Sequence, residues 1–201
     1  MANDQSTHLG LRPLRQPFGN QNIIYLRANT SRDIFKWQPI ARNNSGQAAV
    51  ADIGDNIFIL GPAVGFLDLN YASLPTDMTD LSQGPYLQSV DGFVAVLADP
   101  NQLYIMEADT GGSVFIDQEQ IGNVFGFTYL ATTGNTTTGI ANALLDVSTA
   151  ATGTGGTFQL VGLAGNINQD GTLNTGSANF TKGVVRIALY QHGPTVVSPA
   201  V

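Results

Sequence analysis

The sequence has no cysteine and few charged residues, and both absences restrict the chemistry open to it. Without cysteine, the 201-residue chain forms neither disulfides nor a thiolate metal site. The only histidines, His8 and His192, lie near opposite ends and lack zinc-site spacing. No Gly-rich phosphate loop and no Gly-x-Ser-x-Gly elbow occurs in the sequence. We therefore expect no catalytic residue, metal or cofactor.

Long apolar runs are also missing. The longest stretch without charge, 120–145, is interrupted by Gly, Asn and six Thr, so it does not have the composition of a membrane span. The first ten residues, MANDQSTHLG, are polar and lack the apolar core of a signal peptide. We expect a protein that is made and used without crossing a membrane, and no membrane partner.

Basic residues are absent from most of the chain. Six of the eight Lys and Arg lie at or before Arg42, and the next is Lys182. Residues 1–42 carry a net charge of +4, 43–181 carry −13, and 182–201 carry +2. Because an acidic body repels phosphate, this pattern predicts that a basic N-terminal segment reaches an acidic protein partner, and that nucleic acid is not bound directly. Alternatively, Arg12 and Arg15 are solvated tail charges.

The remaining composition is typical of β-structure. Charged residues make up 11% of the chain, against about 25% in an average soluble domain, and Gly, Thr, Asn and Val are abundant. Short apolar or alternating runs bounded by turn residues recur along the sequence. These runs span 22–28, 34–40, 47–53, 56–60, 65–72, 92–98, 102–108, 124–130, 157–163 and 183–191. Such spacing predicts an all-β fold, a single β-sandwich or barrel-like domain.

The domain is predicted to carry appendages and long loops. Residues 1–20, with Pro13 and Pro17 and no periodicity, are expected to form an extended arm; 21–201 form the β-domain, with 193–201 extended. The low-complexity stretches 131–139 and 148–157 are expected to be Gly/Thr/Asn-rich surface loops. Residues 117–122 favour one helical turn, and 139–146 fit a helix or a strand.

Two motifs suggest chemistry but fit simpler structures better. Asp109-Thr110-Gly111 matches the catalytic triplet of aspartic proteases, but a single copy functions only in a symmetric dimer, and a polar turn that closes a β-hairpin explains it better. The segment 166–174 has Asn and Asp at calcium-loop spacing, but Ser177 stands where an EF-hand needs Glu. Asp-Gly within it is a strong turn signal. We expect turns at both places.

Several segments together resemble the capsid decoration (cement) proteins of tailed bacteriophages. These segments are "GLRPLR" near the N-terminus, "FVAVLADPNQLYIMEADTGGSVFIDQEQIGNVFGF" at 93–127, "LLDVST" at 144–149, "FQLVGLAGN" at 158–166 and "GVVRIALYQH" at 183–192. The resemblance covers Gly10 to His192, and its motifs are structural rather than catalytic. Two insertions, "TTGNTTTG" and 166–182, depart from the family pattern.

The resemblance implies a virion structural protein and not an enzyme. It implies binding to the outer surface of an icosahedral head, with the major capsid protein as partner, and a homo-oligomer, a trimer more readily than a dimer. The residues expected to contact the capsid or a sister subunit are Leu11, Arg12, Pro13, Leu14, Arg15, Phe18 and Trp37. For Trp37, ordinary core packing is an equal alternative. The rival function is a glycan-binding module of an adhesin on the virion surface.

Overall fold

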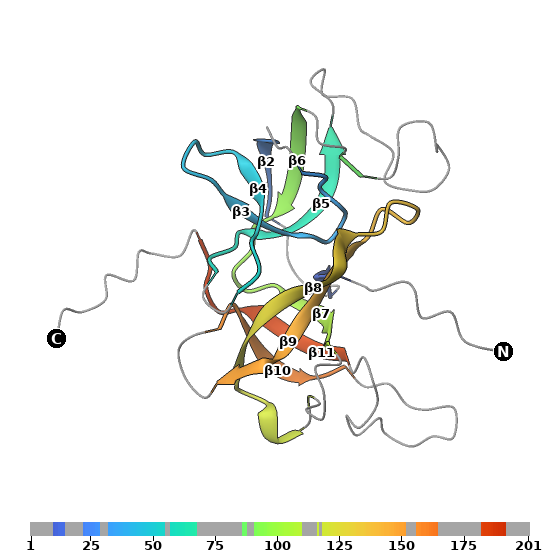
Figure 1. Cartoon of the computed structure of the whole chain (residues 1–201). Coiled ribbons are helices and arrows are strands. Elements are labelled where there is room, and N and C mark those ends of the chain that lie inside the picture. Colours follow the sequence, from blue (N-terminus) through green and yellow to red (C-terminus); the bar gives the residue numbers. More distant parts are fainter. Residues whose placement is uncertain are drawn as a thin grey trace.

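The computed structural model describes residues 10–14, 22–28, 32–54, 57–67, 86–87, 91–109, 116, 118–151, 156–164 and 182–191. These residues form an all-β fold, as the composition predicts. A small closed barrel and a six-stranded sheet lie one above the other in Figure 1. Within the described part, the single helical element is the 3₁₀ turn Gln118–Gln120, inside the predicted turn at 117–122.

The barrel contains five consecutive strands of the chain. Around the barrel their order is β2 (Ile23–Ala28), β4 (Ala48–Val50), β3 (Pro39–Arg42), β5 (Gly61–Leu67) and β6 (Gly92–Leu97), which pairs again with β2. All pairs are antiparallel except β2 and β4, which are parallel and pair only through Ala28 and Ala48. Alternate inward positions supply a core of Ile, Leu, Val, Ala and one Phe. The barrel therefore has its own hydrophobic core.

The six-stranded sheet combines the N-terminal strand with the second half of the chain. Its order is β1 (Arg12–Pro13), β7 (Leu103–Glu107), β11 (Lys182–Ile187), β10 (Phe158–Leu163), β8 (Val124–Gly134) and β9 (Ala141–Ala151). The sheet curls, because Ala108 bridges to Leu145 and Asp109 N–H donates to Leu145 C=O at 2.9 Å. The Asp109 carboxylate accepts a hydrogen bond from Val147 N–H at 3.1 Å, which fixes this contact.

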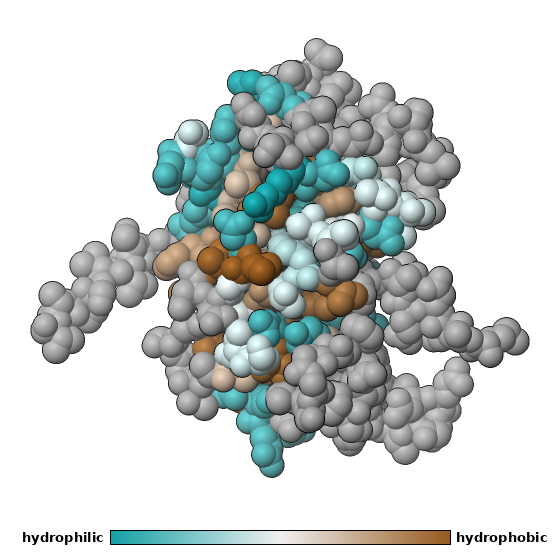
Figure 2. Space-filling view, viewed as in Figure 1, coloured by the Kyte–Doolittle hydropathy of each residue, from teal (hydrophilic) through white to brown (hydrophobic). Residues whose placement is uncertain are grey.

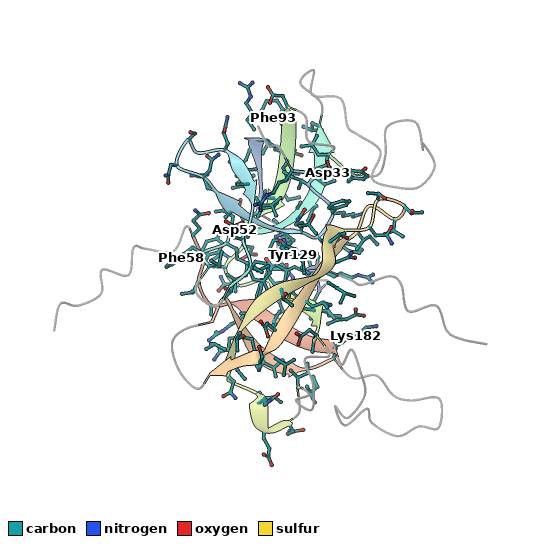
Figure 3. All side chains as sticks on the ribbon, in the orientation of Figure 1. Asp33, Asp52, Phe58, Phe93, Tyr129 and Lys182 are labelled. Carbon is teal, nitrogen blue, oxygen red and sulfur yellow. The ribbon has the colours of Figure 1, made fainter. Side chains whose placement is uncertain are left out.

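The barrel and the sheet are joined by both packing and backbone hydrogen bonds. Tyr129, labelled between the two parts in Figure 3, packs against both cores, and its hydroxyl donates to Ala51 C=O at 3.2 Å. Isolated bridges pair Lys36 with Ile140, Gly54 with Phe127, and Ile59 with Tyr190. The described residues thus form one connected body with two hydrophobic cores.

The structure differs from the sequence-based expectations in several loops. Residues 148–151 continue β9, so the predicted loop at 148–157 is wrong for its first four residues. The expected turns at 110–111 and 166–174 lie outside the described residues. Residues 131–134 continue β8, so the predicted loop at 131–139 is reduced to a tight turn after Gly134. From Ala141 onward the ambiguous 139–146 segment belongs to β9, where buried residues alternate and then run together against the sheet core. Thr is uncharged but β-branched, so a Thr-rich stretch extends a strand as readily as it forms a loop.

Candidate functional site: a basic and aromatic cluster

The first described residues of the N-terminal segment are part of the sheet. Leu11 is fully buried in the larger core, and its N–H donates to Trp37 C=O at 2.8 Å. Leu14 N–H donates to Leu103 C=O at 2.9 Å, and the buried Gln102 side chain donates to Leu14 C=O at 2.6 Å. Residues 10–14 are therefore fixed to their own chain, with β1 at the edge of the sheet.

Trp37 connects this segment to the barrel through an unusual backbone conformation. Its φ angle is 62°, the left-handed region that bulky residues avoid. The conformation lets Trp37 N–H donate to Ala63 C=O at 2.7 Å while its carbonyl faces Leu11. Gly10, also at positive φ (58°), lies so close that a Cβ there would be 2.8 Å from the Trp37 carbonyl oxygen. Such strain costs about 1–3 kcal/mol and is common at functional positions.

Two cationic side chains lie against the Trp37 ring. The Arg12 guanidinium carbon and the Lys36 ammonium nitrogen are each 5.2 Å from the ring centroid. At such separations a cation–π contact contributes about 0.5–1 kcal/mol at an exposed site. We name Arg12, Lys36 and Trp37 the basic–aromatic cluster. The cluster holds two positive charges close together at the junction of the barrel and β1.

These two charges have no carboxylate partner among the described residues, unlike most other basic side chains there. Arg27 pairs with Asp91 at 3.0 Å, Arg32 with Asp52 at 3.0 Å, and Lys182 with Glu107 at 3.7 Å. Arg186 Nε donates to Gln159 Oε1 at 2.6 Å. The cluster can therefore pair with carboxylates supplied by another molecule, at low cost because no internal ion pair is broken.

The seven residues expected from the sequence to make contacts fall into three groups. Arg12 and Trp37 come together in the cluster, and Pro13 and Leu14 lie beside them, partly buried. Leu11 faces the core of its own chain and offers no surface. Arg15 and Phe18 lie outside the described residues.

Two residues that help to build the site were not expected from the sequence: Lys36, which lies against Trp37, and Gln102, which holds Leu14. Lys36 was detectable, since it is basic and adjacent to the single Trp. Gln102 gave no signal, because the hydrogen bond by which it holds the N-terminal segment reaches Leu14, 88 positions away in the sequence.

A scan of protein-family models and searches of curated proteins and solved structures found no match to this chain. Among the residues that the structure describes, no cluster of three or more metal-ligating side chains occurs. In that part of the chain, no helix is long and apolar enough to cross a bilayer. Proposals about function therefore rest on the residues and their geometry.

The positive φ of Trp37 leads to a prediction about two substitutions. Trp37→Ala and Trp37→Gly both remove the ring, but only glycine relieves the left-handed strain. We expect the glycine variant to be more stable than the alanine variant by about 1 kcal/mol. Urea unfolding followed by far-UV circular dichroism measures this difference. An alanine variant as stable as the glycine variant would show that Trp37 does not have this conformation in solution.

Proposed function

We propose that the chain is a capsid decoration protein, bound to the outer surface of a bacteriophage head through the basic–aromatic cluster. The observation that carries this proposal is the pair of cations Arg12 and Lys36, held on Trp37 and without a carboxylate partner among the described residues, in a chain of net charge −7. A positive patch on an otherwise acidic protein directs one face toward an acidic partner and keeps the others away. The resemblance to cement proteins supplies the partner, the major capsid protein.

The edge strand β1 favours contact through side chains over strand addition. Pro13 has no N–H to donate, and β1 is only two residues long, two features that protect a sheet edge from pairing. The exposed Arg12 side chain and the half-buried Trp37 are the groups that a partner meets. The capsid contact is therefore an electrostatic and aromatic one, with Trp and Arg as its anchors.

A second surface is available for contact between sister subunits. Ile53 and Phe58 are 60% and 56% exposed, respectively, which is high for large apolar side chains. Phe58 lies at the left between barrel and sheet in Figure 3, and brown surface gathers across the same middle region in Figure 2. Exposed apolar surface of this kind is typical of protein–protein contacts. We propose that it joins copies of the chain into an oligomer, for which a trimer remains our expectation.

The two surfaces together define how a shell is reinforced. Each subunit of an oligomer presents its own cluster, so several weak ionic contacts act at once and dissociation requires all of them to break. An oligomer that spans neighbouring capsid subunits resists their separation when packaged DNA presses on the shell. The acidic remainder of the chain faces solvent, where like charge keeps particles dispersed.

Co-sedimentation with capsids tests this proposal. Expanded capsids assembled from the cognate major capsid protein without decoration protein are mixed with the full chain, and bound protein is measured against concentration. We expect saturation near one copy per capsid subunit. The double variant Arg12→Gln/Lys36→Gln should bind at least about tenfold more weakly, equivalent to about 1.4 kcal/mol, with a smaller dependence on salt.

The matched control is Arg27→Gln/Arg32→Gln, which also removes two positive charges but from side chains in exposed ion pairs. This control should bind within about threefold of the wild type, because both side chains lie outside the cluster and pair with carboxylates of their own chain. Equal losses in both double variants would mean that only net charge matters and would remove the cluster from the proposal. No binding by the full chain would refute capsid decoration itself.

A further inference from the structure

A pocket opens in the wall of the barrel where two strands diverge. β2 and β4 pair only through Ala28 and Ala48, so toward Asn22 the first strand separates from the β3–β4 hairpin, its neighbour in Figure 1. The opening has a volume of about 410 Å³, within the range of about 300–1,000 Å³ typical of ligand sites. It lies apart from the basic–aromatic cluster, which contributes no lining residue.

Arg42, the last residue of β3, lines this pocket without a partner for its charge. Its Nε atom is buried and has no hydrogen bond, and no carboxylate of the described residues forms an ion pair with it. The backbone is held firmly: Gln191 Oε1 accepts from Arg42 N–H at 2.6 Å, and Gln191 Nε2 donates to Arg42 C=O at 2.9 Å. A partly desolvated guanidinium with no counter-ion among the described residues is costly unless a ligand supplies one.

The other walls of the pocket combine aromatic, amide and apolar groups. Tyr25 on β2 is 59% exposed and lies at the rim, and Tyr190 comes from the segment after β11. Burial, with a smaller contribution from Asp99, raises the pKa of the Tyr190 phenol. Tyr190 therefore stays protonated at neutral pH and contributes a phenol, rather than a phenolate, to the pocket wall. Asn22 adds an amide, of which Nδ2 donates to Ala98 C=O at 3.1 Å.

We propose that this pocket binds a ligand that carries a carboxylate beside a ring, of the class of acidic sugars. The Arg42 guanidinium pairs with the carboxylate, whose planar geometry matches its fork of donors. The ring lies against Tyr25, and the sugar hydroxyls meet Tyr190 and Asn22. Pockets with apolar and aromatic walls and a few convergent polar groups are the common form of small-molecule sites. This inference does not depend on capsid binding.

Phosphate groups fit the pocket less well than carboxylates. The pocket has a single cation, and Asp99 is close enough to Tyr190 to influence its titration. A doubly charged phosphate would meet that carboxylate with one counter-charge only, whereas a singly charged carboxylate is balanced by Arg42. Neutral sugars would leave the guanidinium unpaired and should bind poorly.

An NMR titration of the full-length chain tests the proposal. The probes are sodium glucuronate and N-acetylneuraminate as acidic sugars, glucose as the neutral sugar, and benzoate as a carboxylate on a ring without hydroxyls. At least one acidic sugar should change the backbone amide chemical shifts of residues 22–26 and 42, with a dissociation constant on the order of 1 mM. Glucose should leave these amides unchanged. Benzoate should bind more weakly than the acidic sugar.

Variants separate the guanidinium from a general charge effect. Arg42→Gln should weaken acidic-sugar binding at least about tenfold, whereas Arg27→Gln, on the same barrel and outside the pocket, should leave it unchanged. Tyr25→Ala removes an exposed side chain, so it keeps the fold and should still weaken binding several-fold even where Arg42→Gln perturbs the barrel. No shift with either acidic sugar up to about 50 mM, well above a ~1 mM constant, overturns the site. Binding of benzoate alone overturns the assignment to sugars.

Discussion

Leu11→Ala is expected to lower the free energy of unfolding by about 3 kcal/mol, within the ~2–5 kcal/mol typical of buried leucines. Leu11 has no exposed surface and packs in the core beneath the six-stranded sheet. The substitution removes apolar contacts and leaves a cavity where β1 meets β7. Urea unfolding monitored by the fluorescence of Trp37, whose carbonyl accepts from Leu11 N–H, measures the loss directly.

The matched control for this prediction is Leu130→Ala. Leu130 is also in the sheet, on β8, but is 41% exposed. Its truncation should cost less than about 1 kcal/mol, because little apolar surface is returned to water. A Leu11→Ala variant as stable as Leu130→Ala would mean that the N-terminal segment leaves the sheet in solution. In that case a free arm, rather than a fixed edge, would present Arg12 to a capsid.

Gly61→Ala should prevent the barrel from closing. Gly61 begins β5 with a φ of 153°, and an added Cβ would overlap the carbonyl group of Leu97 at the end of β6. Gly61 pairs with Ile40 of β3, and Leu97 pairs with Ile23 of β2, so neither backbone moves without disturbing the pairing of the barrel wall. We expect a loss above about 4 kcal/mol, among the largest single-residue effects, seen as insoluble protein or a strongly lowered Tm.

Gly46→Ala is the matched control, because it introduces backbone strain without the steric overlap expected at Gly61. Gly46 has a φ of 76° in the turn between β3 and β4, and nothing lies within 4 Å of a Cβ built there. Its replacement should cost only about 1 kcal/mol for the left-handed conformation. Equal Tm values for the two variants would contradict the close contact between Gly61 and Leu97.

The sequence predicts the fold class and most strands because alternation and turn residues are local signals. The runs at 92–98, 102–108 and 157–163 match β6, β7 and β10 to within one residue at each end. The runs at 56–60 and 65–72 fit less well, because the strand here, β5, spans Gly61–Leu67. Pro62 and two glycines occupy that strand, and in the sequence they resemble turn residues. The structure shows why a glycine is needed there: the backbone of Gly61 lies against the carbonyl group of Leu97.

Other features depend on contacts that no local pattern reveals. The separation into two cores follows from the closure of β2 on β4 and β6, which involves strands far apart in the chain. Arg12 and Trp37 attract attention individually, as a basic residue near the terminus and the single Trp, but their stacking requires the fold. The pocket brings Arg42 and Tyr190 together across almost the whole sequence. Such pairings are set by tertiary packing.

The place of β1 in the sheet has a consequence for how the chain is synthesised. The five barrel strands are contiguous between Ile23 and Leu97, so the barrel can assemble as soon as they leave the ribosome. Pro13, in contrast, must wait for Tyr104, its partner in β7. Until Tyr104 has been translated, the basic segment therefore has no strand to pair with on the nascent chain. Under the proposed capsid-binding function, the pairing of β1 would then delay attachment until translation has passed β7, and incomplete subunits would not attach prematurely.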